Sequence, residues 1–154
     1  ESIYAEGETS LEQVVIERLR MRSATLALAE VGSGGTVEAA LSGADAAGEV
    51  VLGAYVAATL ERLGRLLDAN DGQWAQETAS SGAVEELARA TAEAAGSAWA
   101  IAIGPQRDDG TVEVAFRHPS GRLESERIAL RGTGETARSR FVTHLLDRFR
   151  RRMQ

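Results

Sequence analysis

The most constraining stretch of the sequence covers residues 26–41 and reads LALAEVGSGGTVEAAL. Its alternating leucines and alanines end at Glu30 and are typical of a buried strand, whereas residues 36–41 have the spacing of a helix. The turn between them, residues 31–35, is rich in small residues. A strand, a glycine turn and a helix in this order point several backbone N–H groups at one spot beside a positive helix N-terminus. The stretch therefore predicts a βα unit with an anion site at its turn.

The other apolar patterns predict further helices and strands. Thr9 or Ser10 can cap a first helix, and i, i+3 and i+4 spacing predicts helices at about 11–22, 60–67, 84–95 and 133–153. The alanine-rich helix at 84–95 is expected to pack closely against a sheet. Asn70-Asp71-Gly72 predicts the end of the helix at 60–67, and Trp74 is expected in the loop after it. Strands are predicted at about 50–55, 99–103, 111–116 and 123–130.

Strands that alternate with helices predict a single α/β domain. We expect a three-layer α/β/α domain with a mixed, mainly parallel sheet of about five strands. The 154 residues suit one domain with its own core. Residues 1–10 are expected to be a linker or entry strand after an upstream domain, and residues 11–154 are expected to form the domain itself.

Arginine supplies every positive side chain, because the chain has seventeen arginines and no lysine. This composition excludes a lysine Schiff base, a P-loop lysine and a lysine general base. The net charge of −6 argues against non-specific binding to nucleic acid, which depends on neutralising phosphates. A cluster near the C-terminal end is predicted to be a solvated helical turn favoured by the helix dipole, not a nucleic-acid patch: Arg148, Arg150, Arg151 and Arg152.

Cysteine is absent, which excludes a disulfide framework, a thiolate nucleophile and a cysteine metal site and fits a cytoplasmic protein. The two histidines, His118 and His144, have no partner at metal-ligand spacing, so we expect neither a metal nor a cofactor. No apolar run approaches the ~20 residues of a membrane helix, and no membrane partner is expected.

Several motifs occur in an order typical of one family. Residues 29–35 read A-E-V-G-S-G-G, and residues 82–88 read G-A-V-E-E-L-A. The segment Gly110-Thr111-Val112 opens a predicted strand, and Arg138 lies on the last helix. These segments resemble A-E-S-C-T-G-G, G-A-V-S-E-E-V-A, V-G-T-V and a recurring arginine in the CinA C-terminal domain family. Residues 4–12 resemble the linker that precedes this domain in full-length CinA.

The resemblance implies an activity and the loss of its catalytic residues. Members of the family hydrolyse the amide of nicotinamide mononucleotide (NMN) to nicotinate mononucleotide and ammonia without a metal, and they commonly self-associate. They use a serine after the motif glutamate and a lysine in Y-x-N-x-x-K. Here Tyr55 is retained, but Ala57 replaces the asparagine, and the serine and lysine positions hold Val31 and Leu60. The family's long glycine-rich substrate loop is shortened to residues 103–110.

Four other residues are candidates for a ligand site. Ser33 is a candidate nucleophile, but a helix N-cap or turn hydroxyl is the favoured interpretation because no lysine can activate it. Glu30 either orients a ligand or caps the neighbouring turn. Tyr55 either contacts a ribose or base or packs partly in the core, and Arg138 either binds a phosphate or forms a surface ion pair.

Three functions remain open at this point. The chain is a catalytically inactive CinA-type domain that binds a nucleotide or serves in assembly, an active NMN amidohydrolase with substitute residues, or a structural oligomerisation domain. We favour the first, with a pyridine mononucleotide as the ligand and a homo-oligomer as the assembly. We predict that the amides of Ser33, Gly34 and Gly35 face an open pocket that Arg138 reaches, and that amidohydrolase activity is absent.

Overall fold

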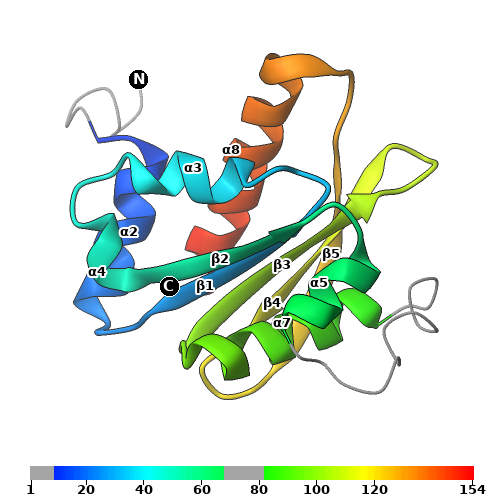
Figure 1. Cartoon of the computed structure of the whole chain (residues 1–154). Helices are drawn as coiled ribbons and strands as arrows, with labels where there is room; N and C mark the ends of the chain where they lie inside the picture. Colours follow the sequence, from blue (N-terminus) through cyan, green and yellow to red (C-terminus); the bar gives the residue numbers. More distant parts are fainter. Residues whose placement is uncertain (1–8, 68–81) are drawn as a thin grey trace.

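The computed structural model describes residues 9–67 and 82–154 (Figure 1). The predicted turn Asn70-Asp71-Gly72, Trp74 and most of the predicted linker lie outside the described residues. Ser10 caps the first helix as expected, since its Oγ accepts a hydrogen bond from the N–H of Gln13 (3.1 Å). The elements follow in the order α2 (Leu11–Met21), β1 (Leu26–Val31), α3 (Thr36–Ser42), α4 (Ala47–Val50), β2 (Val51–Ala57), α5 (Leu60–Leu66), α7 (Ala83–Ala95), β3 (Trp99–Gln106), β4 (Thr111–Arg117), β5 (Leu123–Ala129) and α8 (Gly134–Arg152).

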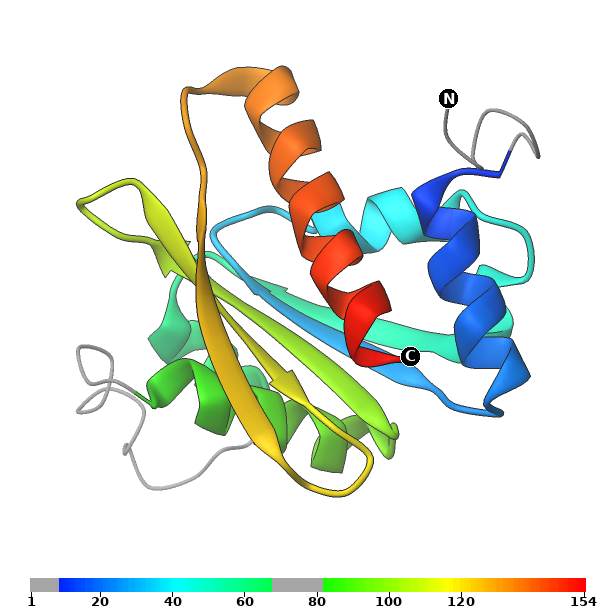
Figure 2. The ribbon, with the colours of Figure 1, turned by 180° about the vertical axis from the view of Figure 1, so that it is seen from behind.

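The five strands form one mixed sheet in the order β2-β1-β3-β4-β5. Strand β1 is parallel to β2 and β3, whereas β4 is antiparallel to β3 and β5, so β4 alone runs against the other four. Helices cover both faces of the sheet: α2, α3, α4 and α8 lie on one, and α5 and α7 on the other (Figure 2). The predicted three-layer α/β domain is confirmed.

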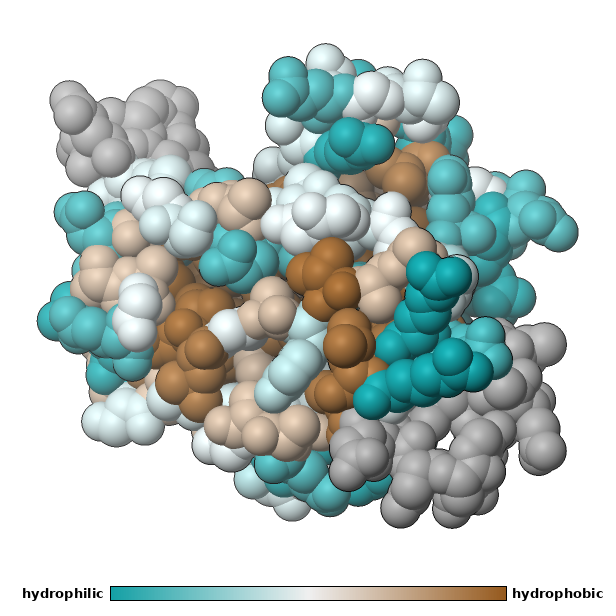
Figure 3. Space-filling model, in the orientation of Figure 1, coloured by the Kyte–Doolittle hydropathy of each residue, from teal (hydrophilic) through white to brown (hydrophobic). Residues whose placement is uncertain are grey.

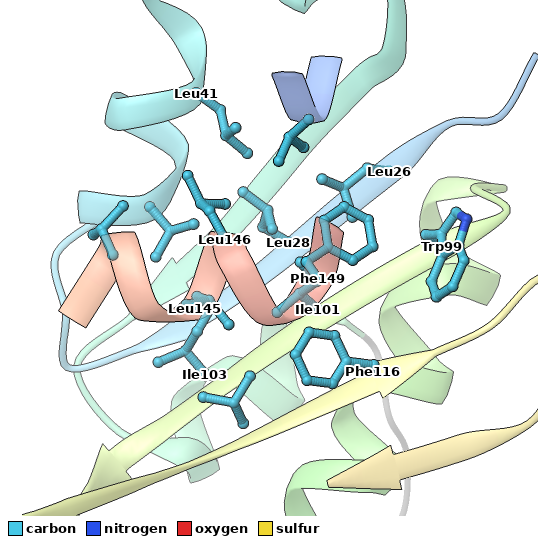
Figure 4. Packing of buried hydrophobic residues seen from close by; sticks show 14 of the residues in the cluster. Leu26, Leu28, Leu41, Trp99, Ile101, Ile103, Phe116, Leu145, Leu146 and Phe149 are labelled. Carbon is cyan, nitrogen blue, oxygen red and sulfur yellow. The ribbon is translucent and has the colours of Figure 1, made fainter. Parts of the chain in front are cut away.

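The two faces of the sheet carry side chains of different size. Leu28 and Ile101 point to the α2–α8 face, where they join the larger hydrophobic cluster (Figure 4). Ala29 and Ala102 belong to the cluster on the α5–α7 face. Small side chains let α7 approach the sheet closely, and a Cβ placed on Gly104 would lie 3.0 Å from a methyl carbon of Val84.

Two elements differ from the prediction. Strand β3 continues past Ile103 to Gln106, through Pro105, with a shift of register against β4 between Ile103 and Gln106. Proline is tolerated there because an irregular strand end does not require its missing N–H. The short helix α4 was not expected, and it includes Val50, which the sequence assigned to a strand.

Arg150, Arg151 and Arg152 lie in the last turn of α8 as predicted, but of the four clustered arginines only Arg151 is mainly solvated, and all four form ion pairs. Arg148 Nε lies 2.6 Å from a carboxylate oxygen of Glu126, and Arg152 lies 2.8 Å from Glu124 and 2.9 Å from Glu126. Carboxylates two residues apart share one side of β5, and arginines four residues apart share one side of α8. Because these two spacings match, the ion pairs hold α8 against the edge strand β5. Arg150 and Arg151 pair with Asp147 within α8.

Glu124 links this network to the aromatic core. The Nε2 atom of His118 lies 2.5 Å from its carboxylate, and the His118 ring centroid is 4.6 Å from that of Trp99. Burial acts to raise the pKa of Glu124, but hydrogen bonds from His118 and Arg152 outweigh burial and hold that pKa below its ordinary value of 4.5. The charged form of Glu124 therefore stabilises the folded state.

Candidate functional site

The turn after β1 depends on glycine. The N–H of Gly32 still donates to the carbonyl of Ala57 (2.9 Å), so the turn begins while attached to β2. Gly32, Gly34 and Gly35 have φ angles of 76°, 71° and 83°, in the left-handed region that side chains disfavour. The three glycines thus allow the backbone to turn sharply between β1 and α3.

The side chain of Glu30 fills the N-terminal end of α3. Glu30 is fully buried, its Oε1 accepts from the N–H of Val37 (3.1 Å), and its Oε2 accepts from the N–H of Glu38 (2.9 Å). These N–H groups are the ones that a bound anion would need. The Glu30 carboxylate therefore takes two N–H groups of this helix end, beside the Ser33, Gly34 and Gly35 amides that the sequence analysis assigned to an anion, and of the two roles considered for Glu30 the structure shows capping.

Ser33 is tied to the same carboxylate. Its Oγ donates a hydrogen bond to Oε1 of Glu30 (2.7 Å), and its carbonyl accepts one from the hydroxyl of Thr36 (2.5 Å). The N-cap position of α3 belongs to Gly35, which has no side chain to cap with. Ser33 is thus a turn hydroxyl and not the helix cap.

A cavity of about 150 Å³ opens beside this turn, at the carboxyl ends of β1 and β3. Carboxyl ends of parallel strands are where α/β folds bind ligands. The cavity is bordered mainly by apolar residues and also by the polar side chains of Ser33, Gln106 and Arg138; its apolar lining includes Val31, Val37, Ile103, Val112, Leu130 and Phe141. Gln106 was not singled out from the sequence, although its place at the end of a predicted central strand was a usable signal.

A second, more open hollow of about 520 Å³ adjoins the first. Gly34 and Gly35 line it, together with Glu12 and Glu135, and both Thr36 and Arg138 border the two spaces. The structure therefore brings Ser33, Gly34, Gly35 and Arg138 to one place, and Arg138 stands between an apolar cavity and a polar hollow.

Tyr55 and Leu60 lie apart from these cavities. Tyr55 packs against the cluster on the α5–α7 face and lines neither space, which fits a partly core role. Leu60 is buried in that cluster, and so is Val31, whose side chain also borders the small cavity. The side chains at the two positions matched to the family's serine and lysine therefore share one apolar cluster.

No group of histidine and acidic side chains that could hold a metal occurs within residues 9–67 and 82–154. His118 pairs with Glu124 and borders neither cavity, nor does His144. None of the helices in the described part of the chain combines the length and apolar character of a membrane span.

Comparison with known proteins decides the family. The model of the CinA C-terminal domain matches residues 8–153, and the fold and glycine turn agree with the resemblance already noted. This chain belongs to the CinA C-terminal domain family. Its cavities therefore lie in a CinA-type domain, at the turn that carries the A-E-x-x-x-G-G pattern.

Relatives with similar sequences are also CinA-like. A CinA-like protein of Anaeromyxobacter sp. strain K is 33% identical over 167 residues, which cover 97% of this chain and 39% of the relative. A CinA-like protein of Gemmatimonas aurantiaca is 32% identical over 163 residues, with coverage of 97% and 37%. The chain thus spans about two fifths of the length of these curated relatives.

Solved structures share the CinA fold. A CinA superfamily protein from Enterobacter cloacae has a TM-score of 0.81 at 23% identity, covering 94% of this chain and 90% of that one. A CinA superfamily protein from Klebsiella pneumoniae 700603 has a TM-score of 0.77 at 25% identity, covering 93% and 95%. A competence or damage-inducible protein from Enterobacter asburiae has a TM-score of 0.81 at 21% identity, covering 94% and 96%.

Proposed function

We propose that this CinA-type domain is non-catalytic and binds a pyridine mononucleotide beside the glycine turn. The observation that carries the proposal is the burial of Val31 and Leu60, which are 1% and 5% exposed and pack in one hydrophobic cluster. By the family resemblance, these positions belong to the nucleophilic serine and the lysine base. Neither side chain has an atom that can attack an amide or accept a proton.

Other residues do not supply the missing chemistry. An alcohol attacks an amide only with an adjacent base, and the chain has no lysine. Arginine does not release its proton within a protein. Ser33 has a carboxylate neighbour, but the Glu30 carboxylate is already bound by two backbone N–H groups that fix the start of α3. We therefore assign Glu30 and Ser33 to the structure of the turn.

The two adjoining spaces suit the parts of a mononucleotide. An apolar cavity of about 150 Å³ holds a single aromatic ring, and the larger hollow leaves room for a sugar phosphate. Arg138 is exposed, has no ion-pair partner among the described residues and borders both spaces, so its guanidinium can bind a phosphate through two N–H groups. The carboxylates of Glu12 and Glu135 can accept hydrogen bonds from ribose hydroxyls.

Calorimetric titration with NMN and with nicotinate mononucleotide tests the binding. We expect saturable binding that weakens at least tenfold in Arg138→Ala. Arg140→Ala is the matched control, because Arg140 is an exposed arginine on the same helix that borders neither cavity, and it should bind as the unaltered protein does. Absence of binding to both nucleotides would refute the ligand and leave a structural oligomerisation domain as the function.

An ammonia-release assay with NMN tests the loss of catalysis. We expect no release above the level of a buffer blank. Ammonia release that Ser33→Ala abolishes would show that the Ser33–Glu30 pair replaces the lost residues, and the domain would then be an active amidohydrolase.

A further inference from the structure

Helix α8 is held firmly at only one of its ends. Among the described residues, the ion pairs of α8 all involve Asp147 or a residue after it, and Leu145 and Phe149 are fully buried in the same half. At the other end, residues 131–136 are all exposed, and Ala137 is the first buried side chain. In Figure 3, mainly hydrophilic residues form the top of the molecule, where Figure 1 draws the start of α8. The start of α8 therefore opens more easily than its second half does.

The chain that leads into α8 carries two glycines that can act as hinges. Gly132 and Gly134 have φ angles of 84° and 85°, and a Cβ on either glycine would meet no atom within 4 Å beyond its chain neighbours. Surrounding atoms thus confine neither position, and glycine adopts positive and negative φ about equally well. Thr133, the N-cap residue between them, makes no side-chain hydrogen bond to the helix, whereas Ser10 and Thr59 cap α2 and α5. An uncapped helix start between two glycines is suited to local opening.

The loosely held residues border the two spaces beside the glycine turn. Arg138 borders both the apolar cavity and the adjoining hollow, and Glu135 borders the hollow. Leu130 and Phe141, which line the apolar cavity on either side of these residues in the chain, are fixed more firmly. The N–H of Leu130 donates to the carbonyl of Gly110 (3.0 Å), and Phe141 is buried in the hydrophobic core. A displacement of the residues between Leu130 and Phe141 therefore changes access to the cavity.

We propose that residues 131–140 form a gate that opens and closes the apolar cavity. The gate consists of the segment before α8 and the first two turns of the helix. It turns about its two glycines and ends where Phe141 enters the core. The carbonyl of Leu130 accepts a hydrogen bond from Nε2 of the exposed Gln106 (3.3 Å), which fixes the base of the gate to the end of β3. The inference concerns access to the cavity and does not depend on which ligand the cavity binds.

Reaction of a single introduced cysteine with iodoacetamide tests the gate. The chain has no cysteine, and a buried thiol reacts only when the structure opens around it. Val112 borders the apolar cavity, whereas Val114, two residues along the same face of β4, is fully buried and borders neither space. Val114→Cys is thus the matched control, which reacts only when a larger part of the fold opens. We expect Val112→Cys to react at least about tenfold faster than Val114→Cys.

Substitutions in α8 show whether the gate limits this reaction. Arg140 lies in the gate and His144 lies beyond it, and both are exposed and border neither space. Because glycine favours the unwound helix, Arg140→Gly should raise the rate of Val112→Cys roughly threefold, and His144→Gly should leave it unchanged. Thr133→Asp, which supplies a helix cap, should lower that rate. The proposal is overturned by a rate that Arg140→Gly does not change, by equal effects of the two glycine substitutions, or by equal rates of the two cysteine variants.

Hydrogen exchange tests the gate in the unaltered protein. The N–H groups of residues 138–141 bond within the first turns of α8, and those of residues 146–149 bond within its firmly held half. We expect the first group to exchange at least about tenfold faster than the second. Residues 15–18 are the matched control, because they hold the same positions after the capped start of α2 and should exchange more slowly than residues 138–141. Exchange of residues 138–141 as slow as that of either other group would refute the gate.

Discussion

Replacing Glu30 with glutamine tests the account of the glycine turn most directly. The substitution keeps the size of the side chain but leaves only one oxygen as an acceptor. The remaining oxygen can still accept from Ser33 and Val37, whose donors both reach Oε1. The new NH2 group must then face the N–H of Glu38, 2.9 Å from the present Oε2, so two donors oppose each other.

The expected loss of stability follows from these contacts. A hydrogen bond to a charged acceptor contributes about 1.5–3 kcal/mol, and leaving the part-buried N–H of Glu38 unsatisfied costs at most about as much again. We therefore expect Glu30→Gln to lower the free energy of unfolding by about 3 kcal/mol. For a chain of this length that loss corresponds to a fall in Tm of roughly 6–12 °C.

Urea unfolding followed by circular dichroism measures this change. Glu38→Gln is the matched control, since it makes the same chemical change in the first turn of α3 and removes only a helix-dipole interaction of about 0.3–1 kcal/mol. A stability of Glu30→Gln within about 0.5 kcal/mol of the unaltered protein would refute the capping role.

Three further substitutions test the packing, the ion pairs and the proposed loss of catalysis. Gly104→Ala should destabilise the fold by about 1–3 kcal/mol, because its Cβ would meet Val84 at 3.0 Å, and Val84→Ala should recover part of that loss in a double-mutant cycle. Glu124→Gln should lower the free energy of unfolding by about 1–2 kcal/mol at neutral pH. Because the pKa of Glu124 is lowered in the folded state, the stability difference between this variant and the unaltered protein, measured by urea unfolding, should shrink as the pH falls below about 4.5 and the carboxylate becomes protonated. Leu60→Lys should cost about 2–4 kcal/mol, because it buries an amine among apolar side chains, and combining it with Val31→Ser should restore little ammonia release from NMN.

The fold was predictable because its main elements are long and strongly patterned. Residues 26–41 gave β1, the turn and α3 within one or two residues, and the alternation at residues 111–116 gave β4. Helix α4 has only four residues, so its sequence cannot show a repeating helical pattern. It follows Ala46, whose φ of 66° is unfavourable for a residue other than glycine and could not be predicted from the residue type. Strand β3 continues through Pro105 because its pairing with β4 is irregular there, and the sequence of β3 alone does not show this irregular pairing.

The position of the candidate site in the fold was predictable, but the contacts within it were not. The resemblance and the strand–turn–helix order together located the turn and Arg138. Neither could show that Glu30 would reach forward to α3, because seven or eight residues separate the carboxylate from the N–H groups it binds. Tyr55 faces the α5–α7 layer because side chains alternate along a strand, and a difference of one residue decides the face.

The position of α8 has a consequence for synthesis of the chain. This helix is the last described element, and it covers the face of β1 and β3 where the large side chains lie, together with α2, which precedes the strands in the chain. A ribosome therefore releases all five strands before the helix that buries Phe116 and Leu28 has emerged. Until then the apolar face of the central strands stays open to other nascent chains. Protection of this face from aggregation during translation thus depends on the nineteen-residue helix α8.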